Sequence, residues 1–241
     1  MTEPRYTCVG AAGIMAGMTV SPPPLDWNAI DTVLLDMDGT LLDLYFDNHF
    51  WLEHLPLRYA ERHGLDAGQA RARLVDLFAA QRGTLNWYCV DYWSRQLQVD
   101  IGELKREIRH LIAIRPHVDE FLQRLHASPR QVWLVTNAHR TSIGIKMSHT
   151  RLERWFDRVI CSHDLAHPKE HPQFWRRLCA DHPFDPARTL FIDDTVSVLQ
   201  AARTFGVRYL LTLLQPDSRQ ARREATEFPG ILHFDEIMPP P

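Results

Sequence analysis

The chain has 241 residues and a formal net charge of -3, with 27 lysines and arginines against 30 aspartates and glutamates. Hydrophobic residues make up 45% and charged residues 24%, which excludes a disordered, collagen-like or coiled-coil protein as the main class. The slight excess of acid argues against a general binder of nucleic-acid polymers or of anionic membranes. The length suits one α/β domain, alone or with an inserted unit.

Residues 1–24 form an extension ahead of the folded part. The segment 8–20 is small and apolar but lacks the leucine-rich centre of a secretory signal, so we interpret the extension as disordered or as an over-long start. No apolar run approaches the ~18 residues of a spanning helix. We expect a cytoplasmic protein that does not enter the membrane.

The first predicted strand is followed by an insert. A β-rich apolar run at residues 32–36 predicts a buried strand, whereas residues 44–115 show several helical patterns and no clear strand. Within the insert, Pro56 should kink or break the first helix and Gly64 could end it. Asp66 is suited to cap a later helix. We therefore predict an all-helical insertion directly after the first strand.

The rest of the chain alternates helices with strands. Helices are predicted to begin near Pro116 and Pro172, and a third is predicted to end at Gly206. Such alternation is typical of βαβ units, hence of an α/β fold with a parallel sheet covered on both faces. The predicted strands of this part are residues 131–137, 158–162, 188–194 and 207–213.

Cysteines and histidines give weaker signals. We interpret the four cysteines as small buried hydrophobes of a protein from a reducing compartment, because their spacing indicates neither a disulfide framework nor a zinc site. They are Cys8, Cys89, Cys161 and Cys179. A second set, His163, His167 and His171, recurs at every fourth residue. Two nearby prolines argue against a continuous helix there, so we interpret these histidines as ordinary loop residues.

Three predicted strands end in polar groups suited to one reaction. These groups are Asp36 and Asp38 after the first strand, Thr136 and Asn137 at the end of the second, and Asp193 and Asp194 at the end of the fourth. In an open α/β sheet the ligand lies beyond the carboxyl ends of the strands, so the groups can converge. Clustered carboxylates need a cation, and hard oxygen ligands favour Mg²⁺.

The segment Asp-Met-Asp-Gly-Thr-Leu at residues 36–41 resembles the first motif of the haloacid-dehalogenase-like (HAD) phosphatases. Thr136 with Asn137, Lys169, and Asp193 with Asp194 sit where that family places its second, third and fourth motifs. The resemblance covers residues 31–213. It implies the HAD fold, a Rossmann-like parallel-sheet core with an inserted all-helical cap domain. The core would comprise residues 25–43 and 116–241, and the cap residues 44–115.

The resemblance also implies catalytic roles for the carboxylates. Asp36 would attack phosphorus and form an aspartyl-phosphate, while Asp38 would protonate the leaving oxygen and then activate water. Mg²⁺ would be held by Asp36, the carbonyl of Asp38 and one aspartate of the fourth motif. We favour Asp194 as this ligand, with Asp193 as the alternative. Dehalogenases of the superfamily lack the second aspartate and need no metal, so Asp38 favours phosphate chemistry.

The second and third motifs would bind the phosphoryl group. The resemblance assigns the hydroxyl of Thr136 and the backbone amide of Asn137 to the phosphoryl oxygens. Lys169 would neutralise the charge that grows on them. A loop lysine is usually just a solvated surface charge, so this role depends on the place of Lys169 after the third strand.

Aromatic residues in the insert suggest a substrate. Segments 46–51 and 84–94 are rich in large rings, which usually form a core but can also stack on a nucleobase. Trp87 and Trp93 are the candidates for base contacts. Both segments resemble those of HAD-type purine 5′-nucleotidases, which implies GMP and IMP as substrates.

Two alternatives stay open. One is a HAD phosphatase or mutase that acts on a sugar phosphate or another small phosphorylated metabolite. The other is a non-catalytic phosphoryl-binding protein on the same fold, which the fold alone does not exclude. Loss of Asp36 or Asp38 would mark such a protein, and both are present. The expected partner is a small phosphomonoester, and the sequence leaves the oligomeric state open.

Overall fold

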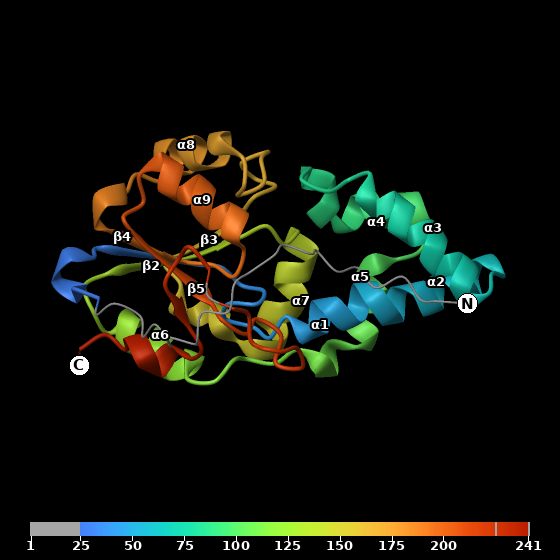
Figure 1. Cartoon of the computed structure of the whole chain (residues 1–241), viewed down its shortest axis with the longest axis horizontal. Coiled ribbons are helices and arrows are strands. Elements are labelled where there is room, and N and C mark those ends of the chain that lie inside the picture. The colour runs from blue at the N-terminus through green and yellow to red at the C-terminus, as the bar shows by residue number, and fades with distance from the viewer. Residues whose placement is uncertain (1–24, 225, 241) are drawn as a thin grey trace, which may run out of the picture.

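One parallel sheet organises the chain, in the strand order β3-β2-β1-β4-β5-β6 (Figure 1). The computed structural model describes residues 25–224 and 226–240, so the predictions for residues 1–24, including Cys8, lie outside the described part. The strands are β1 (Thr32–Leu35), β2 (Gln131–Thr136), β3 (Arg158–Cys161), β4 (Thr189–Ile192), β5 (Tyr209–Leu213) and β6 (Gly230–Ile231).

The apolar runs predicted the first five strands, because most of their residues are buried in the sheet, although β3 begins with the exposed Arg158 and the half-buried Val159. All four residues of β1 are buried, which explains why its sequence shows no alternation. β6 was not predicted, since a two-residue strand is too short to form an apolar run. Its residues pair with the end of β5, where Thr212 lies opposite Gly230 and Leu213 opposite Ile231.

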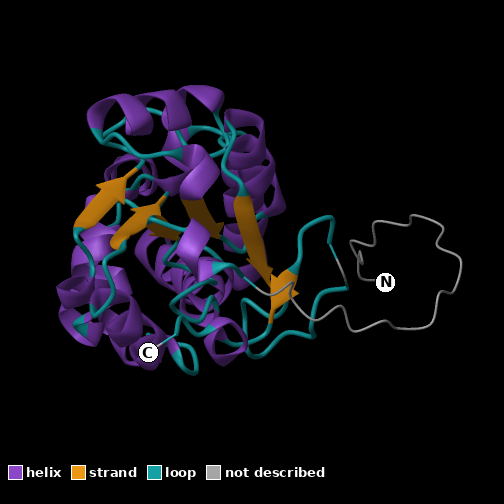
Figure 2. Ribbon diagram, turned by 90° about the vertical axis from the view of Figure 1, so that its left-hand side faces the viewer, coloured by secondary structure: helices purple, strands orange, loops and turns teal. Residues whose placement is uncertain are grey.

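Helices cover both faces of the sheet (Figure 2). Val33 and Leu35 share an apolar cluster with Phe121, whereas Leu34, which points the other way, shares one with Phe174. Figure 1 accordingly shows α8 and α9 on one side of the sheet and α6 on the other. The helices outside the insertion are α6 (Val118–His126), α7 (Arg140–Thr150), α8 (Pro172–Asp181) and α9 (Val196–Phe205). These features confirm the predicted α/β class.

Helices also fill the insertion between β1 and β2. A π-helical segment, Phe50–His54, ends two residues before Pro56, which is the second residue of the following helix. The missing N–H and bulky ring of Pro56 are incompatible with a regular helical turn ahead of it. Gly64 ends that helix in the left-handed conformation, and Asp66 caps the one after it, as predicted. The inserted helices are α1 (Tyr45–His49), α2 (Leu55–His63), α3 (Ala67–Ala79), α4 (Val90–Leu97) and α5 (Ile101–Glu107).

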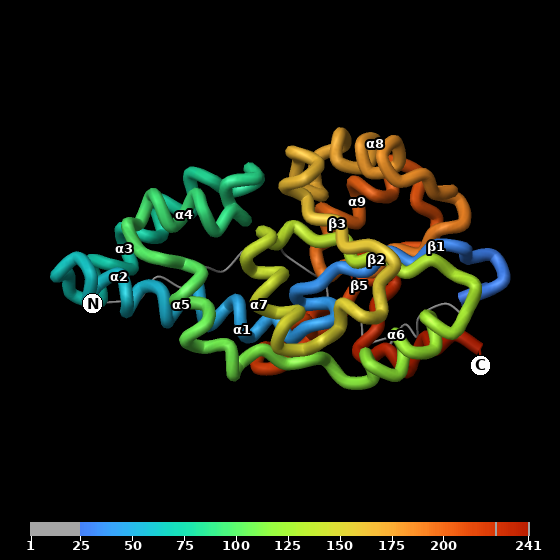
Figure 3. Tube along the Cα trace, turned by 180° about the vertical axis from the view of Figure 1, so that it is seen from behind, coloured from blue at the N-terminus to red at the C-terminus, as the bar shows by residue number. Residues whose placement is uncertain are grey.

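The chain enters and leaves the insertion at one place. Leu42 and Ile114 form an antiparallel bridge, flanked by a 2.9 Å hydrogen bond from the Asp43 amide to the Ala113 carbonyl. Seen from behind, α2, α3 and α4 lie at the end of the molecule opposite the C-terminus (Figure 3). The division into core and cap domains stays a prediction, and its boundaries at residues 44 and 115 fall beside this bridge. Among the described residues, no helix has the length and apolar character needed to span a bilayer.

Candidate active site

The strand order brings three carboxylates together. β1 lies between β2 and β4, and the amide of Asp36 donates a 3.0 Å hydrogen bond to the carbonyl of Ile192 at the end of β4. As a result, carboxylate oxygens of Asp36, Asp193 and Asp194 all lie within 4.8 Å of one another. All three side chains are buried. The structure therefore brings together the acidic residues of the first and fourth motifs.

Lys169 sits inside this acidic cluster. Its Nζ donates hydrogen bonds to Oδ1 of Asp36 at 2.5 Å and to Oδ2 of Asp193 at 2.7 Å. The loop that carries it is fixed on both sides, by a 2.9 Å bond from the Lys169 amide to Asn137 and a 2.8 Å bond from the Trp175 indole to the Lys169 carbonyl. The lysine is thus a buried part of the site rather than a surface charge.

Burial dominates the electrostatics of the cluster. It raises the pKa of Asp36 to about 6, although the ammonium of Lys169 opposes the shift. Burial likewise raises the pKa of Asp193 and of Asp194 to about 6, and the charges of neighbouring carboxylates add to both shifts. Burial alone would lower the pKa of Lys169, but Asp193 and Asp36 outweigh it and raise that pKa. Lys169 thus contacts two of the three carboxylates. Within the described part of the chain, the only cation that contacts the third, Asp194, is the guanidinium of Arg223, an exposed residue, at 3.4 Å, an arrangement that favours a further cation.

Gly39 lets the first motif approach the fourth. Its φ of +81° is a conformation that side chains disfavour, and a Cβ there would lie 2.8 Å from the carboxyl carbon of Asp194. Asp194 also contacts Arg223. The Nη2 of Arg223 lies 3.4 Å from Oδ2 of Asp194, and its Nη1 donates to the Asp194 carbonyl. Glycine is therefore required both for the turn and for the space that it leaves.

Asp38 belongs to a second charged network that sequence reasoning missed. The Nζ of Lys146, on α7, donates 2.6 Å hydrogen bonds to Asp38 and to Asp47. The Nζ of Lys105, on α5, donates a 2.9 Å bond to the other oxygen of Asp47. Burial and the charge of Asp47 raise the pKa of Asp38 to about 6, whereas Lys146 opposes the shift. A carboxyl poised between its two forms suits an acid that later acts as a base.

Thr136 and Asn137 lie beside Lys169. The Oγ of Thr136 accepts a 3.0 Å hydrogen bond from the Ala138 amide, which leaves its own proton to donate. The Asn137 side chain is committed to the neighbouring loop, because its Nδ2 donates to Glu170 at 3.0 Å and its Oδ1 accepts from Lys169. Of the two side chains, the threonine hydroxyl is the better placed to serve a ligand.

A cavity of about 410 Å³ joins these groups to the insertion. Its polar wall includes the predicted site residues Asp36, Asp38, Thr136, Asn137, Lys169, Asp193 and Asp194. The insertion adds the polar groups of Asp47, Asn48 and Lys105. Its aromatic wall comes from the inserted segments and consists of Trp51, Phe78, Trp87, Tyr88 and Trp93. A volume of this order suits a small-molecule ligand. One such ligand could therefore contact both walls.

The two predicted tryptophans differ in their surroundings. Trp87 is half-buried, whereas Trp93 is only 1% exposed, packs edge-on against Phe78 and donates its indole N–H to the Trp87 carbonyl at 3.0 Å. Beside them, the hydroxyl of Tyr88 donates a 2.6 Å hydrogen bond to Glu170 and so ties the insertion to the Lys169 loop. Both tryptophans line the cavity, but the ring of Trp87 is less buried than that of Trp93.

The three regularly spaced histidines do not share a helix, as predicted. His171 caps the N-terminus of α8, and its ring stacks on that of His167 with centroids 4.6 Å apart. His163 lies instead against His139, at 4.9 Å between ring centroids.

Comparisons with known proteins agree with this geometry. Residues 30–206 match the family model of the haloacid dehalogenase-like hydrolases. The GMP/IMP nucleotidase YrfG of Escherichia coli (strain K12) is 38% identical over 213 residues, which cover 88% of this chain and 96% of YrfG.

Two solved structures share the fold at 19% sequence identity. A HAD phosphatase from Thermococcus onnurineus matches with a TM-score of 0.71, over 86% of this chain and 95% of that one. The HAD-hydrolase YfnB from Bacillus subtilis, bound to magnesium, matches with a TM-score of 0.55, over 86% of this chain and 96% of YfnB. Together with the family model and the relative, these matches lead to one conclusion: the chain belongs to the haloacid dehalogenase-like hydrolases.

Proposed function

We propose that the protein is a Mg²⁺-dependent phosphomonoesterase that hydrolyses purine 5′-nucleoside monophosphates, with GMP and IMP as favoured substrates. The observation that carries the proposal is one cavity with two unlike walls, a buried Asp36–Lys169 pair on one side and aromatic rings on the other. The similarity to YrfG, which spans nearly the whole of that nucleotidase, supports the same substrate class.

The donor set of the acidic cluster fits Mg²⁺, which prefers hard oxygen ligands. Asp36, Asp194 and the carbonyl of Asp38 would hold the ion. Asp193 is the weaker candidate, because one of its oxygens accepts from Lys169 and the other accepts a 2.8 Å bond from the Thr195 amide. When bound, the ion would supply positive charge that stabilises the phosphoryl oxygens.

The chain's own residues account for the proposed bond changes. A carboxylate oxygen of Asp36 attacks phosphorus, forming a P–O bond to the aspartate while the bond to the 5′-oxygen breaks. Asp38 gives its proton to that leaving oxygen. In the second step Asp38 takes a proton from water, which attacks phosphorus and frees Asp36. Thr136 donates a hydrogen bond to a phosphoryl oxygen. The ammonium of Lys169 donates to Asp36, Asp193 and the Val135 carbonyl, so it keeps Asp36 oriented and supplies positive charge near the phosphoryl oxygens.

The aromatic wall favours a nucleotide over a sugar phosphate. A phosphoryl group at Asp36 would leave the base to fill the space beside Trp87, where its flat face can stack. A sugar phosphate has no apolar face of that size. It would leave the aromatic wall without a partner.

Phosphate release from a substrate panel tests the proposal. The panel holds GMP, IMP, UMP, ribose 5-phosphate and a small aryl phosphate, each with Mg²⁺ and with EDTA. The expected result is the highest kcat/KM for GMP and IMP, with loss of activity in EDTA. Equal or better release from ribose 5-phosphate would favour a sugar-phosphate phosphatase, and an isomeric phosphate without free phosphate would favour a mutase. Binding without turnover on any ester would favour a non-catalytic protein.

A further inference from the structure

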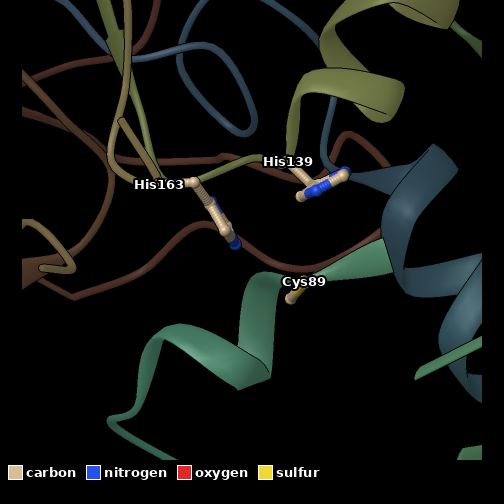
Figure 4. Close-up of side chains that lie close together, drawn as sticks. All are labelled: Cys89, His139 and His163. Carbon is tan, nitrogen blue, oxygen red and sulfur yellow. The ribbon is translucent and has the colours of Figure 1, made fainter. Parts of the chain in front are cut away.

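Three potential metal ligands from separate segments meet beside the cavity (Figure 4). Cys89 precedes α4 in the insertion, His139 precedes α7, and His163 follows β3. One ligand atom from each lies within 4.8 Å of the other two. Their neighbours Tyr88 and Ala138 line the cavity, so the cluster lies where the insertion meets the rest of the chain.

The surroundings of His163 point to a ligand. Its Nδ1 lies 3.7 Å from the sulfur of Cys161, whose own thiol donates to the Ala138 carbonyl at 3.2 Å. The sulfur therefore acts as acceptor for an Nδ1–H, and this tautomer leaves a lone pair on Nε2. That Nε2 is buried and has no hydrogen-bond partner among the described residues. Figure 4 shows a ring nitrogen of His163 directed toward Cys89.

The other two residues are also suited to bind a metal. The sulfur of Cys89 accepts a 3.4 Å hydrogen bond from the Tyr92 amide in the first turn of α4, which orients the side chain at the start of that helix. The Nε2 of His139 lies 3.7 Å from a carboxylate oxygen of Asp91, and its Nδ1 accepts a 3.3 Å hydrogen bond from the Thr141 amide at the start of α7. Nδ1 is therefore the nitrogen that would bind a metal, in exchange for this capping bond. Metal-binding imidazoles commonly have a carboxylate partner such as Asp91.

We propose that Cys89, His139 and His163 form a Zn²⁺ site, separate from the carboxylate cluster, with water as the fourth ligand and Asp91 as the carboxylate partner of His139. One thiolate and two imidazoles suit Zn²⁺, whereas Mg²⁺ prefers oxygen donors. Ligand atoms around tetrahedral zinc are ~3.3–3.8 Å apart, so the three ligand atoms, which lie within 4.8 Å of one another, would need to close by at most about 1.5 Å. The ion then joins the insertion to the rest of the chain at the edge of the cavity.

Cobalt is the probe for this site, because a thiolate bound to Co²⁺ gives a charge-transfer band that carboxylates do not give. Co²⁺ is titrated into the full chain with excess Mg²⁺ present to occupy oxygen-donor sites. The expected result is a band that saturates at one equivalent and is removed by Zn²⁺. Cys89→Ser and His163→Gln should abolish it, while Cys8→Ser and Cys179→Ser should keep it. A wild-type chain without the band, or a Cys89→Ser variant that retains it, would overturn the proposal.

Thermal unfolding gives a second readout that also checks folding of the variants. A ligand that binds only the native state raises the unfolding midpoint. Excess Zn²⁺ should therefore raise the midpoint of the wild type and of Cys179→Ser, and should raise that of Cys89→Ser less. The metal-free midpoints of the two cysteine variants show whether each is folded. An equal zinc-induced shift in both variants contradicts a site at Cys89, as does the absence of any shift in the wild type.

Discussion

The ammonium of Lys146 lies 2.6 Å from Oδ1 of Asp38, and it touches Asp47 at the same distance. Lys146 is only 1% exposed, so its charge acts on both carboxylates with little screening by water. Asp47 in turn contacts Lys105. Burial opposes ionisation of Asp47, but the two ammonium groups outweigh it and lower its pKa to about 2. Asp47 therefore remains charged. The positive charge of Lys146 is shared between Asp47 and Asp38, because its ammonium contacts both carboxylates.

Lys146→Gln should change the pH dependence of catalysis. Lys146 lowers the pKa of Asp38, so removing its charge should raise that pKa further. Because Asp38 must be protonated in the first step, the alkaline limb of kcat/KM should move to higher pH. Without the hydrogen bond from Lys146, Asp38 should also be less well oriented, which should reduce kcat by roughly tenfold. General acid–base catalysis as a whole contributes a rate acceleration of ~10²–10⁴-fold. Lys105→Gln, which touches Asp47 but not Asp38, is the matched control and should shift the limb less.

Gly39→Ala should impair activity more than its backbone strain alone explains. Left-handed backbone costs a non-glycine residue roughly 1–2 kcal/mol, and the new Cβ would also press on the carboxylate of Asp194. Gly83 has a similar φ of +79°, but a Cβ there would meet nothing within 4 Å, so Gly83→Ala is the control. Gly83→Ala should lose only the stability that the backbone strain costs, whereas Gly39→Ala should lose more and it alone should need more Mg²⁺ for half-maximal activity. Equal Mg²⁺ dependence in the two would remove Asp194 from the metal site.

Stability without metal should fall as the pH rises. Each carboxyl whose folded pKa is raised to about 6 adds stability that is complete below its unfolded pKa and is lost as pH rises through 6. In EDTA the unfolding midpoint should therefore decrease between about pH 5 and pH 7.5. Mg²⁺ binds the ionised carboxylates, so it should reduce this decrease. Asp194→Asn should be more stable than the wild type in EDTA at about pH 7.5, and the reverse order would show that Arg223 fully compensates the buried charge of Asp194.

Trp87→Ala should separate nucleotide recognition from phosphate chemistry. Stacking is worth ~1–3 kcal/mol per base, so kcat/KM for GMP should fall roughly tenfold to a hundredfold, with little change for a small aryl phosphate. Trp93→Ala should behave differently. Removing a fully buried ring costs ~3–5 kcal/mol, so the unfolding midpoint should drop and both substrates should suffer. Equal losses on both substrates in a stable Trp87→Ala protein would show that Trp87 does not contact the base.

The sequence predicted the features that depend on local chain properties. The strands could be predicted because a strand that is buried on both faces of the sheet is continuously apolar, as in β1. The π-helical segment before Pro56 and the helix end at Gly64 follow from the backbone chemistry of proline and glycine. The convergence of Asp36 with Asp193 follows from the parallel arrangement of the strands that precede them.

Features that depend on contacts between residues far apart in the chain could not be predicted from the sequence. Lys146 lies on α7, which was not predicted, because its buried residues include a serine and a lysine and form no apolar stripe. Its partner Asp38 is 108 positions away in the chain. The cluster of Cys89, His139 and His163 also depends on long-range contacts, because the three residues come together only in the folded chain. The spacing of the cysteines along the sequence therefore could not indicate a metal site there.

Phosphate release from GMP by the wild type and by Asp36→Asn, both with Mg²⁺, tests the central claim most directly. The substitution keeps the shape of the side chain but removes the attacking charge and one metal ligand. The account predicts release by the wild type and a kcat at least ~10³-fold lower in the variant, because covalent catalysis and metal-assisted stabilisation are both lost. Near-normal release by a folded Asp36→Asn protein would contradict it.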